Sequence, residues 1–198
     1  EGVTEAELAG IFEASARKAG IDEFAFQSIV ASKPSNSFPH VYPGLKRVGA
    51  RDLVLFDVGV KVGGRCSDVT RMVVLGRPED EEERALRAVE EALDAALERL
   101  APGAKARDVH DVAVKVLEKH GLERHFIHGL GHGVGLAVHE PPYIREGSED
   151  VLEPGMVVTI EPGVYFPNRF GVRIEEDVLI TERGHEVITG SLQRIFRV

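Results

Sequence analysis

Two segments of the chain are predicted to be β-hairpins that carry acidic residues inside apolar strands. In the first, residues 53–59 and 66–70 lie on either side of Gly63-Gly64, a dipeptide typical of a tight hairpin turn. Asp57 and Asp68 interrupt these strands, and the centre of that pair lies beside the glycine turn. The two side chains are therefore expected to lie nearly opposite each other, with Cβ atoms about 5 Å apart.

The second predicted hairpin repeats this arrangement. Its strands cover residues 157–166 and 172–181, with Pro167-Asn168-Arg169 at the turn. Glu161 and Glu175 form the acidic pair, and the centre of that pair is Asn168. Two such pairs, each centred on its turn and flanked by Val, Ile, Leu or Phe, are hard to explain as solvent-side acids of half-exposed strands. Facing carboxylates repel each other unless a cation lies between them.

Four ionised carboxylates carry about four negative charges, which two divalent cations would neutralise. Oxygen ligands with an added imidazole suit Mn²⁺, Co²⁺, Fe²⁺ or Zn²⁺. Two metal ions about 3.5–4 Å apart can bridge a water molecule, lower its pKa and polarise a carbonyl group. The two hairpins therefore predict a dinuclear metal site for hydrolysis, built on Asp57, Asp68, Glu161 and Glu175.

A glycine-rich loop at residues 128–140 holds three of the eight histidines: His128, His132 and His139. Each could be an ordinary turn or core histidine, but their density favours a role in the same site. One imidazole would complete the metal shell, and the others could bind a substrate carbonyl or the developing oxyanion. The loop fits neither the dinucleotide-binding nor the phosphate-loop pattern. The single-zinc protease motif and the serine nucleophile elbow are also absent, and Cys66 is interpreted as a packing residue.

Composition argues against several other classes of function. The net charge is −9, with 24 Lys and Arg against 33 Asp and Glu, and no long basic block occurs. A nucleic-acid or membrane surface is therefore not expected. No apolar run approaches the ~20 residues of a membrane span, no signal-peptide pattern is present, and the lone Cys66 suits a reducing compartment. We therefore expect a cytoplasmic protein and, because the sequence begins with Glu1, a processed chain or a fragment.

The remaining segments predict helices around the hairpins. Thr4 and Glu7 form a capping-box pattern ahead of a first helix. A longer helix begins at Asp80, and a third ends at Gly121. Hairpin strands form an antiparallel sheet, and amphipathic helices must cover one face of it. These features predict an α+β protein with a single domain over residues 1–198 and two similar halves.

The order of these residues resembles that of the pita-bread metallopeptidases (the creatinase/aminopeptidase fold), which include methionine aminopeptidase, aminopeptidase P and prolidase. The resemblance implies a curved antiparallel sheet covered by two pairs of helices, with pseudo-two-fold halves. It also implies two divalent metal ions per chain, Mn²⁺ before Co²⁺, Zn²⁺ or Fe²⁺. The implied ligands are Asp57, Asp68, His132, Glu161 and Glu175.

The same resemblance implies roles in catalysis. Glu161 would also accept a proton from the bridging water. His40, in Ser37-Phe38-Pro39-His40, and His139, in Val138-His139-Glu140, match the family's two substrate-side histidines. The second of these would stabilise the tetrahedral intermediate.

Two residues resemble the proline-specific branch of the family: Arg173, two residues before Glu175, and His128, four before His132. By this resemblance Arg173 braces Asp57, and His128 lines the pocket for the proline side of the substrate. The implied function is hydrolysis of Xaa-Pro bonds in dipeptides or short peptides.

Short proline-containing peptides are thus the expected partners, and a homodimer is a further expectation. Methionine aminopeptidase, whose short form fits this length, and a non-catalytic binding module are the alternatives. We expect the N-terminal domain of longer proline-specific relatives to be missing here, and residues 33–37 depart from the pattern of those relatives. Dipeptides and longer peptides therefore both stay open as substrates.

Overall fold

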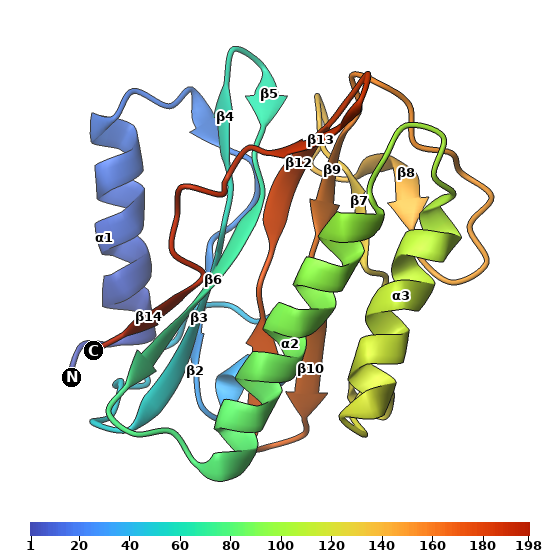
Figure 1. Ribbon diagram of the computed structural model, residues 1–198. Helices are drawn as coiled ribbons and strands as arrows, with labels where there is room; N and C mark the ends of the chain where they lie inside the picture. The colour runs from blue at the N-terminus through green and yellow to red at the C-terminus, as the bar shows by residue number, and fades with distance from the viewer.

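The computed structural model describes residues 1–198 and contains the three helices that the sequence predicts. These are α1 (Glu5–Lys18), α2 (Asp80–Arg99) and α3 (Ala106–Lys119). The capping box is present, because Thr4 Oγ1 accepts the Glu7 N–H at 3.1 Å and the Glu7 carboxylate accepts the Thr4 N–H at 2.7 Å. Figure 1 shows α1 on one side of the molecule and α2 with α3 on the other.

The strands form two larger sheets and two small ones. One larger sheet has the order β14-β6-β3-β2, and the other has the order β13-β12-β9-β7-β8. The small sheets are β1-β4-β5 and β10-β11. The strands are β1 (Glu23–Phe24), β2 (Ile29–Ser32), β3 (Asp52–Val58), β4 (Val60–Val62), β5 (Arg65–Cys66), β6 (Val69–Leu75), β7 (Gly131–Gly133), β8 (Glu140–Ile144), β9 (Val157–Ile160), β10 (Gly163–Phe166), β11 (Phe170–Arg173), β12 (Glu176–Thr181), β13 (Gly184–Val187) and β14 (Ile195–Arg197). Every pairing is antiparallel except that of β14 with β6.

The first hairpin runs from β3 to β6, and its acidic pair differs from the prediction. Gly63 and Gly64 form the turn with φ values of 57° and 76°, as a two-residue hairpin turn requires. In this register Asp57 pairs with Thr70, so Asp68 falls opposite Gly59. The prediction that Asp57 and Asp68 lie nearly opposite each other is therefore wrong by two residues. They are diagonal neighbours on one face, a separation that still allows side chains to meet.

The second hairpin runs from β9 to β12 and matches its prediction. Ile160 pairs with Glu176 and Gly163 with Arg173, which places Glu161 and Glu175 opposite each other in the same register. Asn168 is at the centre of the turn and has a φ of 59°, a left-handed conformation that Asn tolerates better than most residues. Both glutamates lie where the ladder is interrupted between the two sheets.

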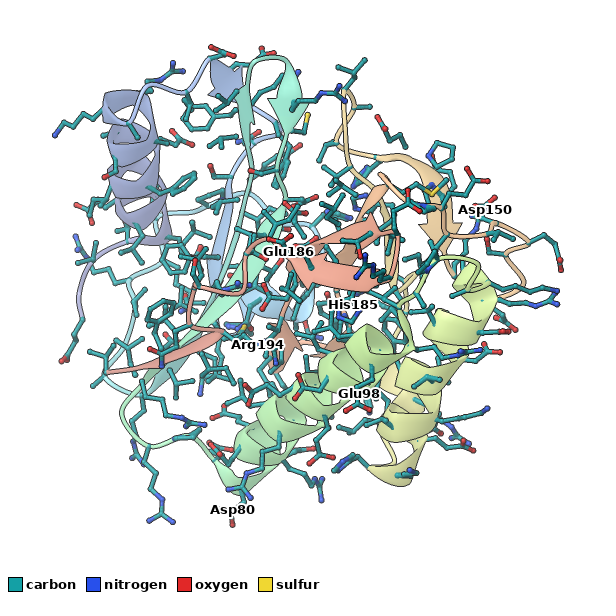
Figure 2. The ribbon with its side chains drawn as sticks, turned by 45° about the horizontal axis from the view of Figure 1, so that its top comes forward. Asp80, Glu98, Asp150, His185, Glu186 and Arg194 are labelled. Carbon is teal, nitrogen blue, oxygen red and sulfur yellow. The ribbon has the colours of Figure 1, made fainter.

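A core of 34 buried residues includes side chains from both hairpins and from α2 and α3. Asp80 is at the start of α2 and Glu98 lies near its end, where His185 of β13 donates to the Leu100 carbonyl at 3.0 Å (Figure 2). The α+β class and the antiparallel hairpins are confirmed. Of the two helix pairs that the resemblance implies, only α2 and α3 pair with each other. No helix is long and apolar enough to cross a membrane.

Candidate active site

The two hairpins meet along the strands that carry their acids. Thr70 of the first hairpin donates to Glu175 Oε2 of the second at 2.7 Å, and the Glu175 N–H donates to the Thr70 carbonyl at 3.2 Å. A cleft of about 730 Å³ opens over this junction. All nine residues that the sequence analysis singles out line it: His40, Asp57, Asp68, His128, His132, His139, Glu161, Arg173 and Glu175.

Three overlapping groups of donor atoms in this cleft are compact enough to hold a metal ion. Within each group the ligand atoms lie within 4.8 Å of one another. The groups are Asp57, Asp68 and Glu175; His132, Glu161 and Glu175; and Asp68, His132 and His139. Because Glu175, Asp68 and His132 each belong to two groups, neighbouring ions in this cleft could share ligands.

The carboxylates repel one another strongly in the absence of a cation. Burial and the neighbouring Asp57 carboxylate raise the pKa of Asp68 well above its ordinary value. Burial and the Asp68 carboxylate do the same to the pKa of Glu175. Burial also raises the pKa of Glu161 to about 8. A cation placed among these groups would reverse these shifts, because it favours the charged form of each acid.

His132 presents an electron pair to these acids. Its Nδ1 lies 3.0 Å from the Gly133 carbonyl and donates to it, which leaves the unprotonated Nε2 facing the cleft. That atom lies 3.4 Å from Glu161 Oε1 and 3.8 Å from Asp68 Oδ2. Burial lowers the pKa of His132 to about 4, so the ring is neutral at pH 7. Because Nε2 carries no proton, it cannot donate a hydrogen bond to ionised Asp68 or Glu161. A cation bound between Nε2 and these oxygens would satisfy all of them.

Asp57 supplies an independent sign that a ligand is expected here. Its side chain is buried, and its Oδ1 has no hydrogen-bond partner. Buried polar atoms are nearly always satisfied, so an orphaned carboxylate oxygen in a cleft points to an ion or water. The oxygen-rich donor set with one imidazole fits a divalent metal ion.

Arg173 holds the other oxygen of Asp57. The two side chains form a buried ion pair, although Arg173 lies on the second hairpin and Asp57 on the first. Arg173 also donates to Thr70 Oγ1 at 3.1 Å and to the Tyr165 hydroxyl at 2.7 Å. A single guanidinium thereby fixes the position of Asp57 relative to both hairpins.

His128 closes a chain of hydrogen bonds that begins at Asp57. Its Nδ1 donates to the Gly129 carbonyl at 2.7 Å, and its Nε2 lies 3.0 Å from the Tyr165 hydroxyl. Burial lowers the pKa of His128 to about 4, so Nε2 is unprotonated and accepts the Tyr165 proton. The hydroxyl can then accept from Arg173, and the chain is fully satisfied.

The glycines of the histidine loop allow close backbone contact. A Cβ atom at Gly131 would lie 1.9 Å from the Thr159 carbonyl oxygen. Only glycine therefore lets β7 lie this close to β9, and the neighbouring His132 N–H donates to Thr159 Oγ1 at 3.1 Å. His139 stands across from His132, with ring centroids 4.2 Å apart and an interplanar angle of 82°.

Residues 1–182 match metallopeptidase family M24. The chain belongs to this family. The M24 chain is 39% identical over 189 residues to an uncharacterized peptidase of Staphylococcus aureus (strain USA300), which covers 96% of this chain but 54% of that protein. It thus spans about half the length of the curated relatives it matches.

Solved structures share the fold of this M24 chain. An X-Pro aminopeptidase from Thermotoga maritima aligns with a TM-score of 0.95 and 39% identity, over 100% of this chain and 56% of its own. A recombinant prolidase from Thermococcus sibiricus has a TM-score of 0.96 and 40% identity, over 100% and 54%. A Xaa-Pro dipeptidase from Bacillus anthracis has a TM-score of 0.96 and 36% identity, over 100% and 56%. The predicted resemblance to the proline-specific pita-bread metallopeptidases is confirmed.

Sequence reasoning missed several residues that contact the M24 site. These are Thr70, which donates to Glu175, Tyr165, which accepts from Arg173, and Asp177, which accepts the Asp68 backbone N–H. The last two lie on the second hairpin at even spacing from Glu161 or Glu175, on the same face as those acids. Thr70 is opposite Asp57 once the register is centred between the two glycines of the turn. Strand alternation and turn geometry therefore contained the signal.

Proposed function

We propose that this M24 chain hydrolyses Xaa-Pro bonds in dipeptides or short peptides, using two divalent metal ions with Mn²⁺ as the first choice. One observation carries the proposal: four carboxylates and one neutral imidazole converge in a single cleft. The X-Pro aminopeptidase, prolidase and Xaa-Pro dipeptidase that share the fold support the proline preference.

The proposed metal ligands are Asp57, Asp68, His132, Glu161 and Glu175. When bound, the metals would polarise the scissile carbonyl group and lower the pKa of a water molecule. Glu161 is the proposed acceptor for the proton of the attacking water. Its carboxyl group belongs to one of the groups of donor atoms that could hold a metal ion, so it would lie beside a water molecule bound there. The same carboxyl group then returns the proton to the leaving prolyl nitrogen.

His40 and His139 are the proposed hydrogen-bond donors to the substrate carbonyl and the developing oxyanion. Both line the cleft, and burial lowers the pKa of His139, so that ring is neutral and carries one N–H for donation. Donors already aimed at the position where charge develops are among the larger contributions to catalysis.

The proline side of the substrate is proposed to lie against His128. The ring of His128 contacts Phe126 edge-on at 5.0 Å between centroids, and the hydrogen bond with Tyr165 fixes its orientation. A rigid ring with an apolar face suits the flat, apolar pyrrolidine of proline. Arg173 contributes indirectly, because it holds both Tyr165 and Asp57.

Steady-state kinetics test the proposal. The Mn²⁺-loaded chain should cleave a Xaa-Pro dipeptide or a longer Xaa-Pro peptide with a higher kcat/KM than a matched Met-Ala peptide. Preference for the Met-Ala peptide would identify a methionine aminopeptidase instead. Absence of cleavage together with absence of bound metal, measured by elemental analysis, would identify a non-catalytic binding module.

A further inference from the structure

Asp177 is a buried acid to which the proposed mechanism gives no role. It lies on β12, pairs with Thr159, and shares the face of the second hairpin that carries Glu161 and Glu175. Its side chain is only 4% exposed. One oxygen, Oδ2, accepts the backbone N–H of Asp68 at 3.1 Å, and the other, Oδ1, is buried with no hydrogen-bond partner. No Lys, Arg or His forms an ion pair with it.

The Asp68 backbone N–H, which donates to Asp177, lies at a break in the first hairpin. Asp68 separates β5 from β6 and is opposite Gly59, which likewise separates β3 from β4. A Cβ atom at Gly59 would lie 2.4 Å from the Ser67 carbonyl oxygen, so the two sides of the hairpin are unusually close here. The Ser67 N–H still donates within the hairpin, to Val60 at 2.9 Å. The Asp68 N–H instead leaves the hairpin and crosses to Asp177.

Asp177 is itself held in place by its backbone. Its N–H donates to Thr189 Oγ1 at 3.0 Å, and its carbonyl accepts the Ile188 N–H at 2.8 Å. Burial of a carboxylate without a paired cation is unfavourable unless hydrogen bonds compensate for it. Here the main compensation is the hydrogen bond from Asp68, so the burial of the Asp177 side chain and the position of Asp68 depend on each other.

We propose that Asp177 is a positioning residue that fixes the Asp68 backbone, so that the Asp68 carboxylate faces Asp57 and Glu175. The inference rests on the proposed function, because it matters only if Asp68 binds metal. Groups that orient a metal ligand typically contribute about 10–100-fold to metal affinity. Asp177 would act on the metal site without touching the metal or the substrate.

The test is a Co²⁺ titration of the full chain by calorimetry, with the visible absorption spectrum of bound Co²⁺ recorded in parallel. Asp177→Ala should weaken Co²⁺ binding by about 10–100-fold and change the spectrum, because the geometry around Asp68 relaxes. Asp177→Asn retains an oxygen that can accept the Asp68 N–H, so it should bind Co²⁺ with nearly the wild-type affinity and spectrum.

Asp52→Ala is the matched control. Asp52 is also buried, at 6% exposure, and also accepts backbone N–H groups, from Leu53 at 3.0 Å and Gly49 at 3.1 Å. It lies at the opposite end of β3 from Asp57. Its loss should lower the urea midpoint of unfolding and leave Co²⁺ affinity unchanged, which separates a positioning role from general destabilisation.

The possible outcomes distinguish the inference from the proposed function. Absence of Co²⁺ binding by the wild-type chain would contradict the proposed function. Equal binding by wild type and Asp177→Ala would leave the proposed function intact and contradict the positioning role, as would an Asp177→Asn variant as weak as Asp177→Ala. If Asp177→Ala fails to fold, Asp177→Ser replaces it with the same expectation, because the shorter hydroxyl cannot reach the Asp68 amide.

Discussion

The two hairpins bring equivalent acids to the cleft by different means. In the second, Glu161 and Glu175 are directly opposite each other, and the turn alone sets their register. In the first, Asp57 and Asp68 are offset by two residues, and Asp68 lies in a break of the ladder. Similar acidic pairs therefore arise from one hairpin whose acids are directly opposed and from one whose acids are offset.

In both hairpins, residues of the partner hairpin hold the acids in place. Both acids of the first hairpin are held by residues of the second: Asp57 by Arg173 and Asp68 by Asp177. The first hairpin in turn holds Glu175, because the Thr70 hydroxyl donates to its carboxylate and the Arg71 side chain donates to its backbone carbonyl. Each hairpin thus positions acids of the other across the junction.

The largest expected effect comes from Glu161 of the second hairpin, which is proposed both to bind metal and to accept the proton of the attacking water. Glu161→Gln should lower kcat/KM by about 10²–10⁴-fold, because the side chain can no longer accept a proton. Asp57→Asn in the first hairpin should lower activity through metal binding alone, so excess Mn²⁺ should recover part of it. Recovery of Glu161→Gln to wild-type activity by excess Mn²⁺ would show that Glu161 is only a ligand.

Arg173→Met removes the support that the second hairpin gives to Asp57. Loss of one partner from a buried ion pair costs about 3–5 kcal/mol of unfolding free energy, which urea denaturation of the chelated protein can measure. Arg169→Met is the control, because its ion pair with Glu81 lies on the surface at the turn of the same hairpin. That loss should stay below about 1 kcal/mol. Equal effects of the two substitutions would contradict a special role for the buried pair.

Metal-free protein should become less stable as the pH rises from 6.5 to 8. The folded-state pKa of Glu161, about 8, exceeds its ordinary value of 4.5, so its stabilising effect is complete below pH 4.5 and declines as the pH rises toward 8. His128 and His132 are buried and have lowered pKa values. They reduce the stability of the folded protein only as the pH falls below 6.5, so they do not contribute between pH 6.5 and 8.

Glu161 alone should account for a decrease on the order of 1–2 kcal/mol between pH 6.5 and 8. Calorimetric melting with a chelator measures the trend. With Mn²⁺ bound, the decrease should be smaller, because the cation stabilises the ionised acids. Chelated protein that gains stability over this range would contradict the account of crowded carboxyl groups.

The smallest expected effect is on the proline side. His128→Phe keeps the packing against Phe126 but loses one hydrogen bond to Tyr165, worth about 0.5–1.5 kcal/mol. KM for a Xaa-Pro dipeptide should therefore rise up to about tenfold, with little change in kcat. A Met-Ala peptide serves as the control substrate, and an equal rise in its KM would contradict a proline-specific role.

Much of the second hairpin was predictable from sequence, because a single turn residue fixes its register. Asn168 lies at the centre of the acidic pair, and the apolar alternation on both sides agrees with that centre. The first hairpin was misjudged because the centre of its acidic pair is not the centre of its turn. Centring on the Gly63-Gly64 dipeptide places Thr70, not Asp68, opposite Asp57.

Contacts between the hairpins were beyond local patterns. Asp177 and Asp68 are separated by 109 positions in sequence, and their hydrogen bond depends on how the two sheets meet. The C-terminal strand β14, parallel to β6, was also not predicted, since three residues carry too little periodicity. The pairing of Arg173 with Asp57 was expected only by family resemblance, and the structure contains that ion pair.

The central claim is that both hairpins together hold two metal ions in one cleft. Electron paramagnetic resonance of the chain during a Mn²⁺ titration tests it directly. After two equivalents, we expect the spectrum of a spin-coupled Mn²⁺ pair, because ions about 3.5–4 Å apart interact through shared ligands. Uncoupled six-line spectra at every ratio, from isolated or free Mn²⁺, would contradict the account.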